Sequence, residues 1–207
     1  MVRAGFPLVR PGVQLYTVRE LLLVDPAKTF RALRAIGFRH VEWHDVQLLN
    51  ILSAEARGAG LQITSCHAML PFLTGDAVQL SRLGVEDPHF RDPSYLLDSL
   101  QAKGIANLVL GYLQPHEREH LDQYRHVIDI MNALGEECRL RGISLCYHNH
   151  DFEFQPMAGE TPMQLMRSGF DKELVGWELD VFWTQFAGYA PQQLVRSLGE
   201  QCRMLHL

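Results

Sequence analysis

The stretch CRLRGISLCYHNH at residues 138–150 holds the pattern that decides the fold. A helical segment rich in Leu and Arg ends in Gly142, and a short apolar run follows it and closes on His148 and His150. Glycine directly after a helix takes the left-handed conformation without a Cβ penalty, so Gly142 predicts a helix end. A short apolar run is typical of a strand that is buried on both faces. The stretch therefore predicts a helix followed by a buried strand.

The same junction recurs along the whole chain. The glycines at 37, 60, 104, 169 and 199 also end helical segments and precede apolar runs. Together with the run PGVQLYTV, these junctions predict seven strands, at residues 12–17, 40–44, 62–67, 107–112, 144–149, 175–181 and 203–207. Strands that alternate with helices favour a parallel α/β sheet. Because no linker divides the chain, we expect a single domain over residues 1–207.

The polar residues at the ends of these strands favour a (β/α)8 TIM barrel over a dinucleotide-binding sheet. The segment QLYTVREL contains no glycine, whereas a dinucleotide-binding fold has a Gly-rich loop after its first strand. Several of the predicted strands end in one or two polar side chains, as strands that surround a barrel mouth do. Because alternate residues share a face, Cys146, His148 and His150 are predicted to face the barrel axis, with Tyr147 and Asn149 facing away.

The predicted barrel is incomplete. A full barrel needs about 250 residues, whereas this chain has 207 and ends inside the seventh predicted strand. The expected fold class is therefore an incomplete (β/α)8 barrel with seven strands, without the last helix, strand and helix. We interpret this as truncation; the alternative is that a partner chain closes the barrel. Open sheet edges also predict association of copies into a homo-oligomer.

Composition excludes several classes of protein. Hydrophobic residues make up 47% of the chain and charged residues 21%, which is typical of a globular protein rather than a disordered one. The net charge of −5 weighs against a nucleic-acid partner, because phosphate binding favours a basic face. An apolar run of about 18 residues is missing, so no membrane association is expected. Four widely spaced cysteines and the lack of a signal sequence predict a reducing cytoplasm.

Three side chains at the ends of successive predicted strands form a candidate metal site. They are His148, Asp180 and His206. Imidazole and carboxylate ligands suit a divalent transition ion such as manganese, cobalt, iron or zinc. For each residue alone, the alternative is a hydrogen-bonded polar group in the barrel mouth. Three such residues converging on one mouth favour a metal ion.

Four stretches carry a resemblance to a known family: VQLYTVRE (13–20), GFRHVEWHD (37–45), YHNHDFEF (147–154) and ELDVFWTQFAG (178–188). With them the chain resembles the sugar phosphate isomerase/epimerase family, whose members are xylose isomerase-like TIM barrels. The resemblance implies a divalent metal held by residues of strands five to eight. In these terms Asp180 matches the strand-six carboxylate and His206 the strand-seven histidine, whereas the strand-eight glutamate would lie beyond Leu207.

Two positions depart from what the resemblance implies. His148 stands where many relatives have a glutamate, which weighs against epimerisation by two glutamates on opposite faces of the substrate. Trp183 stands where the DNA-repair branch of the superfamily has a histidine, which weighs against a DNA substrate. Loss of water or a glycoside thus becomes an alternative to epimerisation.

The remaining polar residues receive predicted roles. His67 and His150 are candidate catalytic residues, because imidazole exchanges protons near neutral pH. Glu42 is a candidate for binding substrate hydroxyls, with a salt bridge as the alternative. Trp183 is a candidate platform for a sugar ring, with packing beneath a loop as the alternative. Glu178 is expected to be a buried ionic partner.

Other charged groups are expected to be solvated. Glu153 and Asp151 fall in the predicted loop after strand five, where solvated charge is the default. The string HEREH at 116–120 lacks the order of a metalloprotease motif and is interpreted as a solvated helix start.

Three functions remain open at this point. The first is a metal-dependent isomerase or epimerase that acts on a small-molecule carbohydrate, a keto-sugar or sugar phosphate, through an enediolate. The second is a metal-dependent lyase or dehydratase on a keto-sugar or keto-inositol. The third is an inactive barrel fragment.

Overall fold

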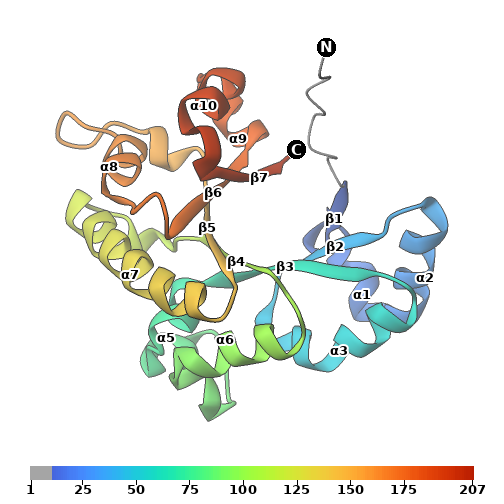
Figure 1. Cartoon of the computed structure of the whole chain (residues 1–207). Helices are drawn as coiled ribbons and strands as arrows, with labels where there is room; N and C mark the ends of the chain where they lie inside the picture. The colour runs from blue at the N-terminus through green and yellow to red at the C-terminus, as the bar shows by residue number, and fades with distance from the viewer. Residues whose placement is uncertain (1–10) are drawn as a thin grey trace. The chain divides into compact units, whose positions relative to one another are not determined.

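The computed structural model describes residues 11–207, and the chain packs as two compact units, Met1–Cys66 and His67–Leu207. Seven strands follow one another in the sheet in chain order, from β1 to β7 (Figure 1). The pairings β1–β2, β2–β3, β4–β5, β5–β6 and β6–β7 are all parallel. The predicted α/β fold class, an incomplete (β/α)8 barrel with seven strands, is confirmed. The expected single domain stays a prediction.

The first unit contains two complete strands and the start of a third. Its elements are β1 (Gly12–Gln14), the 3-10 turn η1 (Leu15–Val18), α1 (Arg19–Val24), α2 (Pro26–Ile36), β2 (His40–Trp43), α3 (Val46–Gly58) and β3 (Gln62–Met69), which continues into the second unit. Strand β1 is shorter than predicted, because the backbone turns into η1 at Leu15. Its core holds Phe30 and Leu33 of α2 against Val41 and Trp43 of β2.

The second unit contains the remaining strands and most of the helices. Its elements are α4 (Leu70–Thr74), α5 (Ala77–Arg82), η2 (Pro88–Arg91), α6 (Pro93–Ala102), β4 (Asn107–Tyr112), η3 (Pro115–Glu117), α7 (Leu121–Leu140), β5 (Ser144–His148), η4 (Phe152–Phe154), α8 (Pro162–Gly169), β6 (Val175–Asp180), α9 (Val181–Phe186), α10 (Pro191–Leu198), η5 (Gly199–Gln201) and β7 (Cys202–His206). Within the described residues, no helix is both long enough and apolar enough to cross a membrane.

The helix ends follow the predicted glycine junctions with one exception. Gly142, after α7, has a φ of 68°, and the glycines at 37, 60, 104 and 199 also have positive φ. Gly169 differs, because it is the last residue of α8 and Phe170 forms the C-cap. A Cβ on Gly169 would lie 2.9 Å from Cδ1 of Ile128 on α7. Gly169 therefore permits two helices to pack closely rather than a left-handed turn.

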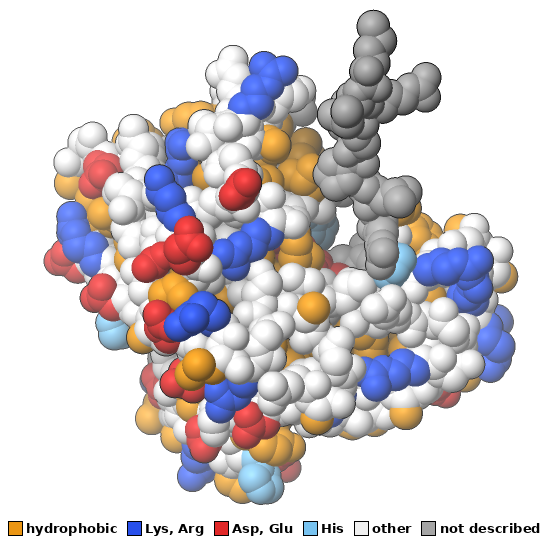
Figure 2. Space-filling view, in the orientation of Figure 1, with side chains coloured by type: hydrophobic (Ala, Val, Ile, Leu, Met, Phe, Trp, Pro, Cys, Tyr) orange, Lys and Arg blue, Asp and Glu red, His pale blue; other side chains and the backbone are white. Residues whose placement is uncertain are grey.

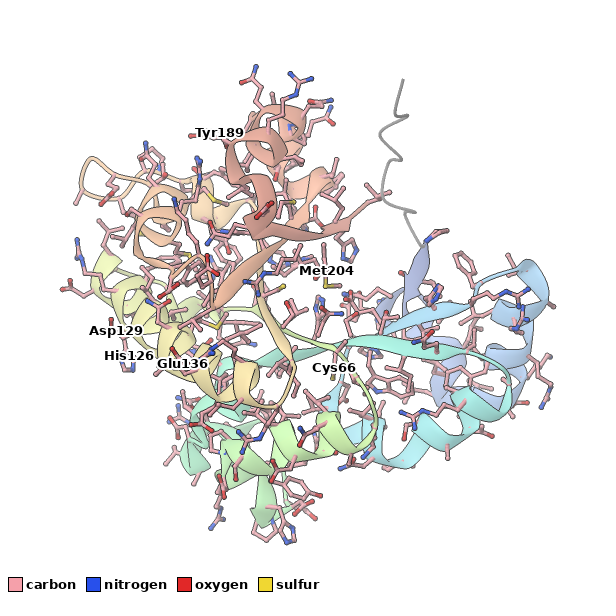
Figure 3. All side chains as sticks on the ribbon, in the orientation of Figure 1. Cys66, His126, Asp129, Glu136, Tyr189 and Met204 are labelled. Atoms are coloured by element: carbon pink, nitrogen blue, oxygen red, sulfur yellow. The ribbon has the colours of Figure 1, made fainter. Side chains whose placement is uncertain are left out.

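Strands β4 to β6 alternate between two faces, as predicted. On the outer face, Leu145 and Tyr147 of β5 and Trp177 and Leu179 of β6 are buried. Helix α7 covers this face, and its exposed side carries His126, Asp129 and Glu136, which point away from the sheet (Figure 3). On the inner face lie Cys146 and His148 of β5 and Glu178 and Asp180 of β6. Helix packing thus leaves the inner face to the polar residues.

Candidate metal centre

Parallel register brings the polar strand ends together. On the inner face, His148 of β5 pairs with Glu178 of β6, and Asp180 of β6 pairs with His206 of β7. Residues paired across parallel strands point to the same side of a sheet. The carboxyl ends of three strands therefore place two histidines and two acids next to one another.

The three predicted metal ligands, His148, Asp180 and His206, converge on one point. One ligand atom of each lies within 4.8 Å of the others. Nε2 of His148 is 3.8 Å from Oδ2 of Asp180, and the ring centroids of His148 and His206 are 5.0 Å apart. His148 and Asp180 are buried, and His206 is half-buried. The residues are brought together as expected, and their role as ligands stays a prediction.

Asp180 is held in place by the start of the next helix. Its Oδ1 accepts a hydrogen bond from the backbone N–H of Trp183 at 2.6 Å and so caps α9. Its own N–H donates to Oδ1 of Asn149 at 3.0 Å, and the Thr184 hydroxyl donates to its carbonyl at 2.6 Å. The cap uses one carboxylate oxygen, so the second oxygen is the one that faces His148.

Glu178, the expected buried ionic partner, lies next to the predicted ligands. We call His67, His148, Glu178, Asp180 and His206 together the cluster. Its Oε2 is 2.7 Å from Nε2 of His67 and 3.0 Å from Nδ1 of His148. Burial raises the pKa of this carboxyl, but the charge and hydrogen bonds of the two histidines outweigh burial and hold the pKa well below its usual range. Glu178 is thus a carboxylate that two histidines share.

His67, a predicted catalytic residue, is closely packed in the second unit. A Cβ on Gly111 of the neighbouring strand β4 would lie 2.5 Å from Nδ1 of His67. Only glycine at position 111 therefore leaves room for this ring. Nε2 of His67 lies against Glu178 and Nδ1 lies over Gly111, and a catalytic role for His67 stays a prediction.

His150, the other predicted catalytic residue, lies beyond the strand rather than on its inner face, because β5 ends at His148. Its ring stacks on Phe152, with centroids 5.3 Å apart, and lies 5.0 Å from the ring of His148. Burial, together with the nearby charges of other histidines and Arg118, lowers the pKa of His150 to about 3. Its buried Nδ1 has no hydrogen-bond partner among the described residues. At neutral pH His150 is therefore an uncharged group beside the cluster.

Glu153 contradicts the expectation of a solvated charge. Its side chain is fully buried, and it accepts hydrogen bonds from the Tyr147 hydroxyl at 2.6 Å and from the backbone N–H of His150 at 2.8 Å. Burial raises the pKa of Glu153 to about 7. Its neighbours Phe152 and Phe154 are also buried, and this Phe-Glu-Phe pattern is the signal from which burial could have been predicted. Glu153 holds the loop that carries His150.

The two predicted substrate-binding residues belong to different units. Trp183 of α9 places its ring 5.6 Å from the ring of His150, so it borders the cluster. Glu42 of β2 is buried in the first unit, where its Oε2 accepts a hydrogen bond from the Ser65 hydroxyl at 2.5 Å. Contact with a substrate stays a prediction for both.

The donor set of His148, Asp180 and His206 fits a divalent transition ion. Two imidazoles and one carboxylate suit manganese, iron, cobalt or zinc. Ligand atoms at bond lengths of 2.0–2.2 Å lie roughly 3.3–3.6 Å from one another around a tetrahedral ion. The 3.8 Å between His148 and Asp180 exceeds this range only slightly. A small closing movement of the side chains would therefore bring His148, Asp180 and His206 to bonding distance.

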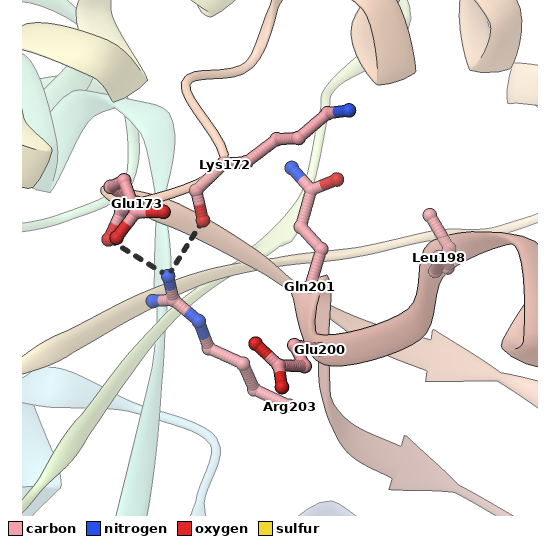
Figure 4. A pocket seen from close by; sticks show the side chains of 6 residues that line it. All are labelled: Lys172, Glu173, Leu198, Glu200, Gln201 and Arg203. Carbon is pink, nitrogen blue, oxygen red and sulfur yellow. Dashed lines mark hydrogen bonds between the residues drawn. The ribbon is translucent and has the colours of Figure 1, made fainter.

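A pocket of about 420 Å³ lies away from these residues, at the amino end of the strands (Figure 4). Arg203 lines it and donates to the carbonyls of Lys172 and Glu173 at 3.3 and 3.0 Å. A Cβ on Gly176 would overlap Cδ of Arg203, so the arginine lies directly over this glycine. Because the guanidinium of Arg203 already donates to backbone carbonyls, we infer that this residue stabilises the fold rather than binds a ligand.

Comparison with known proteins identifies the fold. No protein-family model matches the chain, and no curated protein matches it significantly. A sugar phosphate isomerase/epimerase from Parabacteroides distasonis is similar in structure, with a TM-score of 0.76 and 21% identity over 100% of this chain and 77% of that chain.

Two further solved structures share the architecture at lower identity. The 3-keto-D-glucoside 4-epimerase from E. coli has a TM-score of 0.58 and 17% identity, over 87% of this chain and 72% of that chain. The probable 3-DHS dehydratase of petrobactin synthesis from Bacillus anthracis has a TM-score of 0.59 and 13% identity, over 96% of this chain and 73% of that chain. The fold inferred from the sequence is thus confirmed: the chain forms an incomplete TIM barrel, similar to solved structures described as sugar phosphate isomerase/epimerase and xylose isomerase-like TIM-barrel proteins.

Proposed function

We propose that the chain is a metal-dependent isomerase or epimerase that acts on a keto-sugar or sugar phosphate through an enediolate. The observation that carries the proposal is the convergence of His148, Asp180 and His206 at the carboxyl ends of parallel strands. Active sites of TIM barrels lie at this end of the strands. The similar structures, among them a 3-keto-D-glucoside 4-epimerase, a protein described as D-tagatose 3-epimerase-like and a probable 3-DHS dehydratase, support chemistry at or beside a carbonyl carbon.

The proposed roles follow from the position of each side chain. His148, Asp180 and His206 would hold a divalent cation, which at such a site polarises a carbonyl oxygen and its neighbouring hydroxyl. His150 is uncharged at neutral pH, because burial lowers its pKa to about 3, and it would accept a hydrogen bond from a substrate hydroxyl. Trp183 would present an apolar face to the sugar ring.

The charged surface supports a small-molecule substrate rather than nucleic acid. On the face shown in Figure 2, acidic and basic side chains lie next to one another. Three arginines of the second unit pair with acids: Arg125 with Asp122, Arg139 with Glu136, and Arg141 with Asp98 and Glu137. All four cysteines are free thiols, which supports the proposed cytoplasmic location.

Hydrogen exchange in deuterated water tests the proposal whichever product is formed. The chain, loaded with Mn²⁺ or Co²⁺, is incubated with a panel of keto-sugars and sugar phosphates, and deuterium at the carbon beside the carbonyl is followed by NMR. We expect exchange with the wild type and none with His148→Ala. The exposed Asp98→Ala is the control and should exchange like the wild type. Absence of exchange across the panel, with metal bound, would refute the isomerase proposal.

A dehydratase or lyase is the second candidate, and one observation favours it. Strand β5 presents a histidine, His148, to the cluster, so the strand-five carboxylate that the resemblance implies for two-glutamate epimerisation is replaced. The same incubation distinguishes the two functions, because loss of water lowers the product mass whereas isomerisation keeps it. An inactive barrel fragment, the third candidate, predicts neither bound metal nor exchange.

A further inference from the structure

Glu178 offers one oxygen to two histidines. Its Oε2 is 2.7 Å from Nε2 of His67 and 3.0 Å from Nδ1 of His148. A carboxylate oxygen only accepts hydrogen bonds, so each of the facing nitrogens must carry a hydrogen. The side chain of Glu178 is 2% exposed, so water contributes little to this arrangement. The acid thereby dictates which ring nitrogen holds the hydrogen in two histidines.

The consequence for His148 is a free lone pair on the far side of its ring. With hydrogen on Nδ1, neutral imidazole has an unprotonated Nε2. This Nε2 faces Oδ2 of Asp180 across 3.8 Å, a separation too long for a hydrogen bond. Two electron-rich atoms then face each other beside the ring of His206. A cation bound between them would remove their repulsion.

The consequence for His67 is a fixed ring. Its Nε2–H donates to Glu178, and its Nδ1 lies over Gly111, where a Cβ would come within 2.5 Å. The ring centroids of His67 and His148 are 5.2 Å apart. Glu178 thus orders two rings side by side, of which only His148 turns a nitrogen toward Asp180.

A competing arrangement uses Glu178 as a metal ligand. Ligand atoms of His67, His148 and Glu178 also lie within 4.8 Å of one another. In that case a cation would take the place of the hydrogens, and Nδ1 of His148 would be unprotonated. The two arrangements therefore predict opposite tautomers of His148.

We propose that Glu178 is a positioning residue that sets the tautomers of His67 and His148, so that one cation binds on the Nε2 side of His148. This inference rests on the proposed metal function and adds the residue that prepares its ligand. Mutation of a residue that hydrogen-bonds to a metal-binding histidine typically lowers metal affinity by 10- to 100-fold. The 2.7 and 3.0 Å separations favour hydrogen bonds over a shared ion.

NMR of the histidine ring nitrogens tests the tautomers directly, first in the metal-free protein and then with Zn²⁺ bound, because the competing arrangement changes the tautomer of His148 only when a cation is present. At pH 8 we expect the wild type to carry hydrogen on Nδ1 of His148 and on Nε2 of His67. Glu178→Met removes the acceptor at similar volume, and we expect His148 to lose its preference for hydrogen on Nδ1, because no acceptor then faces that nitrogen. Glu178→Gln keeps an amide oxygen and should keep the wild-type tautomers. Glu153→Gln is the matched control, because Glu153 is equally buried but contacts neither ring.

Titration with Co²⁺ completes the experiment. We expect one ion per chain, with affinity 10- to 100-fold weaker in Glu178→Met than in the wild type. Hydrogen on Nε2 of His148 in the wild type, or a second bound ion, would overturn the inference, and the wild-type spectrum decides this even if Glu178→Met does not fold. If the tautomers are as expected but the wild type binds no ion, the metal function fails while the role of Glu178 stands.

Discussion

The two ends of strands β5 to β7 differ in how fully their polar groups are paired. At the amino end, Arg203 donates to Ser144 Oγ at 3.1 Å and to the carbonyls of Leu145, Leu174, Lys172 and Glu173 at 3.0–3.4 Å. At the carboxyl end, Nδ1 of His150 has no hydrogen-bond partner among the described residues. Nε2 of His148 lies 3.8 Å from Oδ2 of Asp180, which is too far for a hydrogen bond. The guanidinium at the amino end is thus hydrogen-bonded through both of its terminal nitrogens, whereas the two imidazoles at the carboxyl end each keep a ring nitrogen without a hydrogen bond to any described residue.

This difference suggests different roles for the two ends: Arg203 stabilises the sheet, and His148 and His150 are available to bind a ligand. A buried polar group without a partner costs about 1–3 kcal/mol, and a ligand at the carboxyl end would supply the missing contacts of His148 and His150. The hydrogen-bonded guanidinium of Arg203 instead joins β7 to β5 and to the loop before β6. Substitutions at the amino end should therefore change stability, whereas substitutions at the carboxyl end should change binding.

The largest expected effect comes from Asp180→Ala. The change removes a ligand and the cap of α9, so we expect bound Co²⁺ to fall below detection and the free energy of unfolding to fall by about 1 kcal/mol. Metal analysis of the purified protein and urea unfolding measure the two effects. Retention of a full equivalent of metal would show that Asp180 is only a helix cap.

The next effect concerns pH and the buried carboxyl of Glu153. Burial raises its pKa from 4.5 to about 7, so its contribution to stability is full below pH 4.5 and is lost as the pH rises through about 7. Between these pH values, we expect the stability of the wild type to fall by about 3 kcal/mol relative to Glu153→Gln. Urea unfolding of both proteins across this range measures the difference. Parallel pH profiles would contradict the assigned pKa.

The smallest effect is expected at the amino end of these strands. In Gly176→Ala the new Cβ would meet Arg203, so we expect a loss of about 1–3 kcal/mol in unfolding free energy with Co²⁺ affinity unchanged. The matched control is Gly58→Ala in α3, whose Cβ meets nothing within 4 Å and which should stay within about 1 kcal/mol of the wild type. A comparable loss of Co²⁺ affinity in Gly176→Ala would mean that the two ends are not independent.

Strand positions and the inner-face residues could be predicted because they depend on periodicity. The junction of Gly142 with ISLCYH placed β5 correctly, and alternation put His148 inside and Tyr147 outside. Register in a parallel sheet then brought Asp180 beside His206. Local pattern was sufficient for these features, since strand geometry repeats every two residues.

Loops and irregular pairings could not be predicted in the same way. The path after β5 buries Glu153 and takes His150 off the strand, which no two-residue period describes. A register shift between Trp177 and Glu178 in the pairing with β7 lies beside Arg203, which packs over Gly176. The sharing of Glu178 by two histidines depends on three strands and appears only once their side chains are placed in space.

The identity of the ligands around a bound ion is the most direct test of the central claim that His148, Asp180 and His206 form one metal site. X-ray absorption of the protein loaded with one equivalent of Co²⁺ or Zn²⁺ counts imidazoles and gives bond lengths. We predict two imidazoles and one carboxylate at roughly 2.0–2.2 Å, with water completing the shell. The alternative set of His67, His148 and Glu178 has the same ligand types. We therefore also predict that His206→Ala loses one imidazole from the shell, whereas His67→Ala keeps both. A shell with three imidazoles, or the failure of the protein to retain one ion, would contradict the claim.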